Sequence, residues 1–189
     1  MSVRTSLLAV LTLGPAYGFQ LHTELHARTS ARRQVNAGQI YATLDRLQVQ
    51  GAVQSAGVTD DGLPLYALTD AGAIEALDWL HGTDSHVGAE WDDLVDRVLL
   101  AASLPQVDAL EIIAGYRSFW ASRAAQEPAT PGDLADDAAD VFAAAALEWL
   151  RRAEDRLTTA GSAAFARDLN PARPRRGRRP TDPAQLLTD

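Results

Sequence analysis

The chain has 189 residues, of which 47% are hydrophobic and 22% are charged, and its formal net charge is -8. These values are typical of a folded protein with one domain or two small ones. The absence of cysteine excludes a disulfide framework and a thiolate metal site. No apolar run approaches the roughly 18 residues that a membrane span needs, so we expect a cytoplasmic protein with no membrane partner.

The negative charge is unevenly distributed along the chain. Residues 1–82 carry a net charge of -2, residues 83–168 carry -9, and residues 169–189 carry +3. A DNA duplex attracts local groups of arginine rather than the charge of a whole chain. Arg28, Arg32 and Arg33 form such a group, and Arg32 and Arg33 are therefore candidate DNA contacts.

The first elements are two short helices. The first is expected over residues 3–13 and ends at Gly14, because Pro15 disfavours helical geometry in the residue before it. The second is expected from about residue 18 to residue 27, with Phe19, Leu21 and Leu25 as its apolar positions.

Residues 36–50 form the most informative helix of the sequence. Asn36 is a candidate N-cap. At about 100° per residue, Ile40, Leu44 and Leu47 fall on one stripe. The opposite arc carries small and polar residues, which allow a helix backbone to approach base edges in a major groove. The residues of that arc are Gly38, Gln39, Ala42, Asp45 and Arg46, with Tyr41 at its edge.

A β-hairpin is expected directly after this helix. Strands at 52–58 and 63–68 flank Thr59 to Gly62, which is a typical turn sequence, and Pro64 confines its strand to an edge. An exposed helix followed by a hairpin is the arrangement of a recognition helix and its wing. The pattern therefore favours binding to double-stranded DNA.

The rest of the chain is predicted to be helical. Apolar spacing indicates helices at 70–81, 91–102, 107–125 and 134–160. In the first of these, Ile74, Leu77 and Leu80 are expected to face inward. We predict a mainly α protein in three parts: a winged helix-turn-helix domain with a two-stranded wing at 1–82, an all-helical dimerisation and effector domain at 83–168, and a disordered arginine-rich tail at 169–189.

Three motifs carry a resemblance to a known family. Residues 11–21 (LTLGPAYGFQL), 38–47 (GQIYATLDRL) and 66–72 (YALTDAG) resemble the PadR family of bacterial transcriptional regulators. The resemblance implies a winged-helix homodimer that represses transcription and often responds to small aromatic ligands. It also places Tyr17 and Tyr41 against DNA. The DNA-binding candidates are then Tyr17, Arg32, Arg33, Gln39, Tyr41, Thr43 and Arg46.

The hairpin departs from the pattern of that family. Asp60 and Asp61 stand where many members carry cations, so the positive charge must come from elsewhere. Residues 173–180 resemble an AT-hook, whose arginines lie in a narrow minor groove. This tail could equally be solubilising, or could dock onto the chain's own carboxylates. Its candidate minor-groove residues are Arg175, Arg176, Arg178 and Arg179.

Several candidates have a structural alternative. Tyr17 and Tyr41 could pack inside the domain, and Arg46 could be a solvated surface arginine paired with Asp45 or Gln50. The tryptophans could line an effector cavity or a dimer interface, or could be ordinary core residues. Those proposed for the effector or dimer interface are Trp91, Trp120 and Trp149.

The sequence favours binding over catalysis. It contains no recognised nucleophile motif and no glycine-rich phosphate loop. His22 and His26 lie one turn apart, but no glutamate directly follows His22 as zinc proteases require. We therefore expect no enzyme activity, no cofactor and no metal.

The sequence predicts a ligand-responsive repressor that binds an inverted-repeat operator as a homodimer. The alternative is a winged-helix protein–protein interaction module without specific DNA binding.

Overall fold

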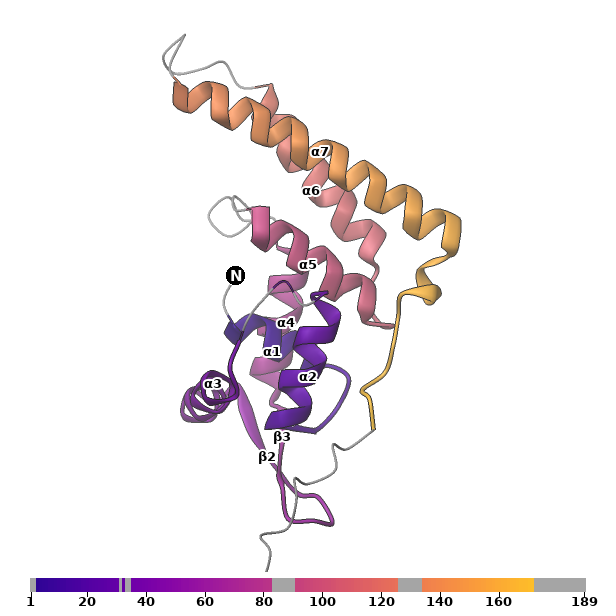
Figure 1. Cartoon of the computed structure of the whole chain (residues 1–189). Coiled ribbons are helices and arrows are strands. Elements are labelled where there is room, and N and C mark those ends of the chain that lie inside the picture. Colours follow the sequence, from indigo (N-terminus) through magenta and orange to yellow (C-terminus); the bar gives the residue numbers. More distant parts are fainter. Residues whose placement is uncertain (1–2, 31, 33–34, 83–90, 126–133, 172–189) are drawn as a thin grey trace, which may run out of the picture.

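The computed structural model describes residues 3–30, 32, 35–82, 91–125 and 134–171, and this part of the chain is mainly helical (Figure 1). Its first elements are α1 (Val3–Leu11), β1 (Ala16–Tyr17), α2 (Gly18–Arg28), α3 (Ala37–Val49), β2 (Val53–Val58), β3 (Pro64–Leu68) and α4 (Asp70–His81). These are followed by α5 (Trp91–Ser103), α6 (Ala109–Ala124), α7 (Leu134–Ala160) and the short 3-10 helix η1 (Ser162–Ala164).

Side-chain caps set the starts of α3, α4 and α6. The Asn36 carboxamide oxygen accepts a hydrogen bond from the Gln39 backbone N–H at 2.8 Å and begins α3. Thr69 caps α4 in the same way, and Asp108 caps α6. These local bonds satisfy N–H groups that the first helical turn leaves free. The bounds predicted for α4 and α7 agree with the structure, and those of the other helices differ by one or two residues.

The sheet contains one more strand than the predicted two-stranded wing. Its order is β1-β3-β2, and both pairs are antiparallel. β1 has only two residues, so it offers no alternation that a sequence could show. The pairing of β2 with β3 shifts between Ser55 and Val58, where Gly57 adopts a φ of +92°. This bulge bends the wing near its tip.

Two apolar clusters overlap at α1, α4 and α5. The first joins the inner faces of α1, α2 and α3 to the sheet, and it includes Leu100 of α5. The second lies among α5, α6 and α7, and it includes Ala9 of α1 and Leu80 of α4. Figure 1 shows the result: α6 and α7 form a long antiparallel pair that projects away from the winged helix, with α5 between the two parts.

The inner face predicted for α4 is wrong in two of its three positions. Leu80 is buried, but Ile74 and Leu77 are 61% and 43% exposed. α4 instead packs through small residues, because a Cβ at Gly72 would lie 1.9 Å from the Ala52 carbonyl oxygen. The close approach of the α4 backbone to Ala52 therefore determines that the face with Gly72, Ala76 and Leu80 points inward. Phe19 of α2, also predicted as apolar core, is exposed.

The segment after α7 returns to the winged helix and lies along α2 (Figure 1). Leu169 packs against the first cluster. The Asn170 N–H donates to Glu24 Oε1 at 2.6 Å, and Gln20 Nε2 donates to the Asn170 carbonyl oxygen at 2.9 Å. Leu169 and Asn170, which the sequence assigned to a disordered tail, are thus held against the winged helix, because the Asn170 backbone groups find polar partners on α2.

Candidate nucleic-acid interface

The outer face of α3 is a row of exposed small and polar side chains. Gln39, Asp45 and Arg46 are exposed, whereas the stripe of Ile40, Leu44 and Leu47 is fully buried. The predicted orientation of the helix is therefore confirmed. Thr43 is the exception among the candidates on α3: it is buried, and its hydroxyl donates to the Gln39 carbonyl oxygen at 2.7 Å.

Tyr41 lies across the N-terminus of α2. Its ring is 40% exposed, and a Cβ added at Gly18 would lie 2.4 Å from its Cε1 atom. The absence of a side chain at Gly18 therefore leaves room for the Tyr41 ring. Tyr17 is only 5% exposed, because it lies in β1, which pairs with β3. The structure does not present Tyr17 or Thr43 as surface contacts.

A buried tyrosine of the sheet stands close to this face. Burial raises the pKa of the Tyr66 phenol above its ordinary value, and the nearby Asp45 and Tyr41 add to the effect. The Tyr66 phenol consequently stays neutral at physiological pH, and it adds no negative charge next to α3.

Of the arginines that precede α3, the two that the structure describes are paired with carboxylates. Arg32 contacts Asp92 at 2.5 Å and Asp96 at 3.8 Å, both on α5. Arg28 is buried, and Arg33 lies outside the described residues. The two described arginines of the predicted basic group thus have counter-ions within the chain: Arg28 is paired with Glu24 of its own helix, and Arg32 with carboxylates of α5.

Arg46 has a different environment. It is exposed on the outer face of α3, and it forms no ion pair with any other residue that the structure describes. The side chain of Gln50, one of its expected partners, accepts a hydrogen bond from Arg4 instead. Arg46 is therefore a cation on the α3 face that is available to an anionic partner.

Hydrogen bonds among residues 59–63 stabilise the turn at the tip of the wing. The Thr59 N–H donates to the Leu63 carbonyl oxygen at 2.8 Å, and the Thr59 hydroxyl donates to Asp61 at 2.5 Å. Gly62 allows the turn with a φ of +81°. No arginine or lysine occurs between residues 52 and 69, so this wing carries two carboxylates and no cation.

The three candidate tryptophans gather in one aromatic cluster between α5, α6 and α7. Trp91 meets Trp149 and Phe142 edge to face, with ring centroids 5.9 and 6.1 Å apart, and Trp120 meets Phe142 at 5.0 Å. Trp120 is fully buried. Trp91, Trp149 and Phe142 are only partly buried and pack against the second apolar cluster. Trp149 and Phe165 also line a cavity of about 390 Å³ between α5 and α7.

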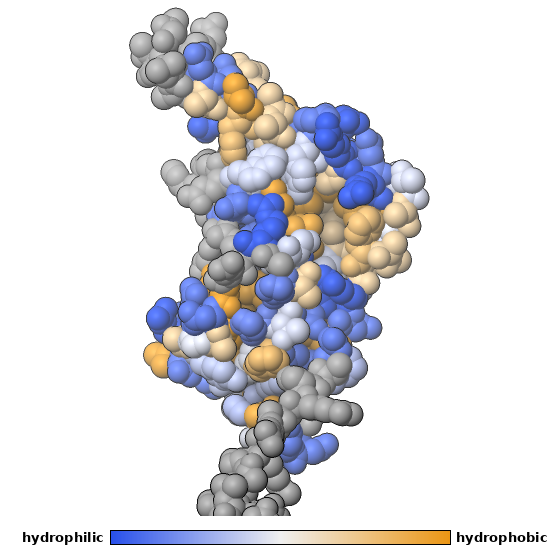
Figure 2. Space-filling model, in the orientation of Figure 1, coloured by the Kyte–Doolittle hydropathy of each residue, from blue (hydrophilic) through white to orange (hydrophobic). Residues whose placement is uncertain are grey.

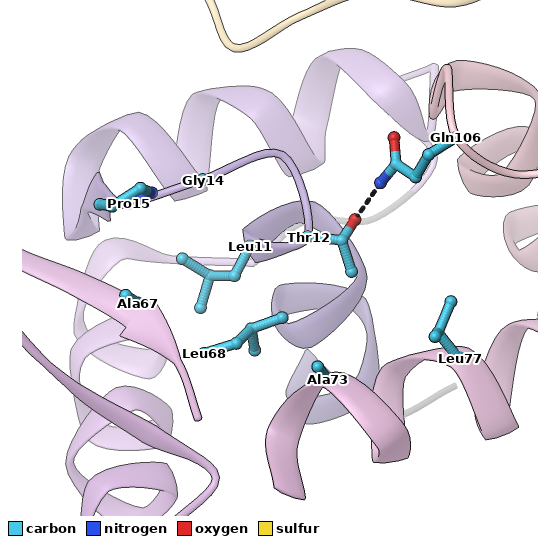
Figure 3. Close-up of a pocket in the computed structure, with 9 residues that line it drawn as sticks. All are labelled: Leu11, Thr12, Gly14, Pro15, Ala67, Leu68, Ala73, Leu77 and Gln106. Atoms are coloured by element: carbon cyan, nitrogen blue, oxygen red, sulfur yellow. Dashed lines mark hydrogen bonds between the residues drawn. The ribbon is translucent and has the colours of Figure 1, made fainter. Parts of the chain in front are cut away.

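A hollow of about 370 Å³ lies where α1, β3 and α4 meet (Figure 3). Leu11, Leu68 and Leu77 line it, and the Gln106 side chain reaches its rim, where its Nε2 donates to the Thr12 hydroxyl at 2.6 Å. No charged side chain borders the hollow. It offers apolar surface but nothing that would orient a charged ligand.

Metal and membrane features do not occur in the described part of the chain. His22 Nε2 lies 2.7 Å from the Val35 carbonyl oxygen, so this ring nitrogen is engaged by backbone. No group of three potential metal ligands exists among the described residues, and none of the described helices is long and apolar enough to cross a membrane.

An exposed helix of a helix-turn-helix followed by a β-hairpin defines the winged helix class of DNA-binding domains. Residues 7–77 match the model of the transcriptional regulator PadR-like family. The three sequence motifs that resemble this family all lie in this part of the chain, from α1 into α4. The family is one of transcriptional regulators and not of enzymes.

Two solved structures share similarity with most of the chain. Bacillus subtilis PadR in complex with operator DNA is 18% identical, with 85% of this chain and 96% of that chain covered and a TM-score of 0.41. The same protein in complex with p-coumaric acid is 17% identical, with coverages of 86% and 98% and a TM-score of 0.40. At these scores the likeness carries no argument about how the elements are arranged. No curated protein sequence matches the chain.

Proposed function

We propose that this chain is a repressor that binds an inverted-repeat DNA operator as a homodimer, with α3 as the reading helix. The observation that carries the proposal is the outer face of α3, where Arg46, which has no ion pair among the described residues, lies exposed beside Gln39 and Tyr41. Arginine pairs with guanine and glutamine with adenine in a major groove. The small residues of the same face let the backbone come close to the bases.

The net charge of the winged helix limits its expected affinity for DNA. Residues 1–82 carry a net charge of -2, Arg28 and Arg32 are engaged internally, and the wing is acidic. Few phosphates are then neutralised by each winged helix. Because log affinity falls with log salt in proportion to the phosphates neutralised, we expect a shallow salt dependence from the winged helices alone.

A homodimer is proposed through the projecting α6–α7 pair. These helices extend beyond the winged helix (Figure 1), and Val141 on α7 is 71% exposed. Two copies related by a two-fold axis would present two reading helices to the two halves of a palindrome.

Sedimentation velocity at micromolar concentration should show a dimer, and Val141→Glu should shift the equilibrium toward the monomer. A wild-type monomer would contradict this part of the proposal.

A second candidate function has its own support. Ile74 and Leu77 leave apolar surface exposed on α4, and the acidic wing repels phosphate. Both observations favour a module that binds another protein. The experiment below separates the two functions, because an interaction module would bind DNA without sequence preference or not at all.

The experiment measures binding to the DNA upstream of the protein's own coding region by fluorescence anisotropy at several salt concentrations. We expect Arg46→Ala to weaken specific binding by roughly 1–3 kcal/mol if it reads a guanine. Arg123→Ala is the matched control, because Arg123 is also exposed but lies at the end of α6. Unfolding midpoints should stay unchanged in both variants. Equal affinity of wild type and Arg46→Ala would remove Arg46 from the interface.

A further inference from the structure

The hollow between α1, β3 and α4 gives the winged helix an apolar surface. Leu11, Leu68 and Leu77 line it (Figure 3), and no charged side chain borders it. Ile74 lies one turn before Leu77 on the same side of α4, and both side chains are exposed. Hydrophilic residues cover most of the winged helix surface seen in Figure 2 and separate its apolar spots from one another. A hollow with exposed apolar neighbours is therefore suited to apolar side chains of another segment.

The segment after α7 comes close to this hollow. The Asn170 carbonyl oxygen accepts a hydrogen bond from Gln20 of α2, and Gln20 is five residues after Pro15, which lines the hollow. Because an extended chain covers at most about 3.6 Å per residue, the Cα atoms of Pro15 and Gln20 lie within roughly 18 Å of each other. The residues that follow Asn170 therefore start within a short distance of the hollow.

Residues 172–189 contain an apolar pair that can reach the hollow. Leu186 and Leu187 are the only large apolar residues of this segment, and Leu186 is sixteen residues after Asn170. An unconstrained chain of that length has a root-mean-square end-to-end distance of roughly 20–24 Å. This length is comparable with the distance to be spanned, so the pair has an effective concentration on the order of 1 mM at the hollow. A dissociation constant in the millimolar range is then sufficient for docking.

The charges of the two partners are complementary. Residues 52–81, which include the wing and α4, contain five carboxylates and no arginine, whereas residues 172–189 contain five arginines and two carboxylates. Asp60 and Asp61 at the wing tip and Asp70 at the start of α4 are exposed. The arginines lie between Asn170 and the leucine pair in sequence, so a segment that is fixed at both ends would keep them near this acidic surface.

We propose that Leu186 and Leu187 dock into the hollow between α1, β3 and α4 of their own chain. Residues 171–185 then form a closed loop across the winged helix, with Asn170 on α2 as its first fixed end and the leucine pair as its second. The docking goes beyond the proposed function, because it requires no DNA. It covers the exposed apolar side chains of α4 without a partner protein.

The test measures the proximity of the two surfaces in the full-length protein. The chain contains no cysteine, so Ala184→Cys can be labelled with a single nitroxide next to the leucine pair. NMR spectra of the leucine methyl groups are recorded with the nitroxide oxidised and then reduced. We expect the oxidised label to broaden the methyl signals of Leu11, Leu68 and Leu77, which line the hollow, and to leave the leucine signals of α7 unchanged.

Substitutions on both surfaces test the contact itself. Leu186→Ser combined with Leu187→Ser should abolish the broadening, because the apolar pair is lost. Gln185→Ser is the matched control in the same segment and should retain it. Ala73→Phe adds a ring to a residue that lines the hollow and should also abolish the broadening, with the melting temperature as the check on folding. If Ala73→Phe does not fold, the two leucine substitutions decide the outcome.

Two results would overturn the proposal. One is the absence of broadening at the hollow, or broadening that persists after both leucine substitutions; the hollow would then be open to a partner protein. The other comes from a mixture of isotope-labelled protein without nitroxide and unlabelled protein that carries it. Broadening in this mixture would mean that the segment docks onto a second copy. No DNA is present in these samples, so a failure of the proposed repressor function would leave the result unaffected.

Discussion

Gly18 and Tyr41 show how one missing side chain shapes the reading face. The ring of Tyr41 occupies the space that a Cβ at residue 18 would need, 2.4 Å from its Cε1 atom. Both residues belong to the helix-turn-helix, one at the start of α2 and the other in α3. The position of a candidate DNA contact is thus set by a buried glycine on the neighbouring helix.

Gly18→Ala should therefore move the Tyr41 ring. We expect a loss of roughly 1–3 kcal/mol of stability from overpacking and weaker DNA binding, measured by urea denaturation and by anisotropy. In a Tyr41→Ala background the ring is gone, and the same substitution should cost almost nothing. An equal cost in both backgrounds would mean that Tyr41 is not what the alanine meets.

Glu148 provides a test of the charges on α7. Hydrogen bonds from Arg151 and Arg152 lower the pKa of its carboxyl to about 2. A lowered pKa contributes stability above the unfolded value of 4.5 and loses it as pH falls toward 2. Carbon-detected NMR titration should show an ionised Glu148 at pH 3, and Arg152→Gln should raise its pKa. A midpoint near the ordinary value in wild type would contradict the ion pairs.

Among the elements, α2 is joined to α5 and to the segment after α7 by one buried guanidinium. Arg28 Nε donates to Glu24 at 2.8 Å, and its Nη1 donates to the carbonyl oxygen and hydroxyl of Ser103 at 2.7 and 3.0 Å. Burial lowers the pKa of Arg28, and Glu24 opposes that shift, but arginine remains charged in proteins. Every donor group of the guanidinium is used, so this residue fixes three elements together.

Glu24→Gln should leave that buried cation without its counter-ion. We expect a loss of roughly 3–5 kcal/mol in the free energy of unfolding, measured by urea denaturation. The double variant Glu24→Leu, Arg28→Met should not recover that loss, because the carbonyl oxygens of Ser103, Arg167 and Asp168 would lose their donor. If the single variant were as stable as wild type, the pair would have no structural role.

The start of α3 depends on one side chain. Asn36→Ala removes the acceptor for the Gln39 N–H and should cost about 1 kcal/mol. Asn36→Asp keeps an acceptor and should retain most of the stability. Thermal unfolding monitored by circular dichroism measures both variants, and identical midpoints for alanine and aspartate would argue against the cap.

At the scale of the whole molecule, the strap of residues 161–171 determines where the arginine-rich end of the chain begins. Asn170 is bound to Gln20 and Glu24 of α2, so the chain lies against the winged helix just before the arginine-rich residues 172–189. They carry five arginines, whereas the wing carries none. We propose that this segment supplies the positive charge that the wing lacks, although its residues lie outside the described structure.

Removal of residues 172–189 should lower affinity for all DNA sequences and flatten the salt dependence by nearly one unit for each phosphate released. The truncation is made after Pro171, so that Leu169 and Asn170 keep their contacts on α2. A full-length variant with Arg175, Arg176, Arg178 and Arg179 changed to glutamine should behave in the same way. Unchanged affinity and slope in both proteins would show that the segment is not a DNA contact.

Local physics determined much of this protein from the sequence alone. The stripe of Ile40, Leu44 and Leu47, the caps at Asn36 and Thr69 and the turn at Gly62 gave the helices, the hairpin and the outward face of α3. Each of these signals depends on residues within a few positions of one another. The same short-range patterns carried the family resemblance.

Only the tertiary structure decided which candidates reach the surface. Tyr17 is buried because two residues pair as β1 with a strand about fifty positions later. Arg32 and Arg28 are engaged by carboxylates and carbonyl groups of distant segments, and α4 turns Ile74 outward because Gly72 meets the Ala52 backbone. The cavity at Phe165 likewise exists only because the chain returns from α7 to α2. Such contacts join residues far apart in sequence, and no local pattern records them.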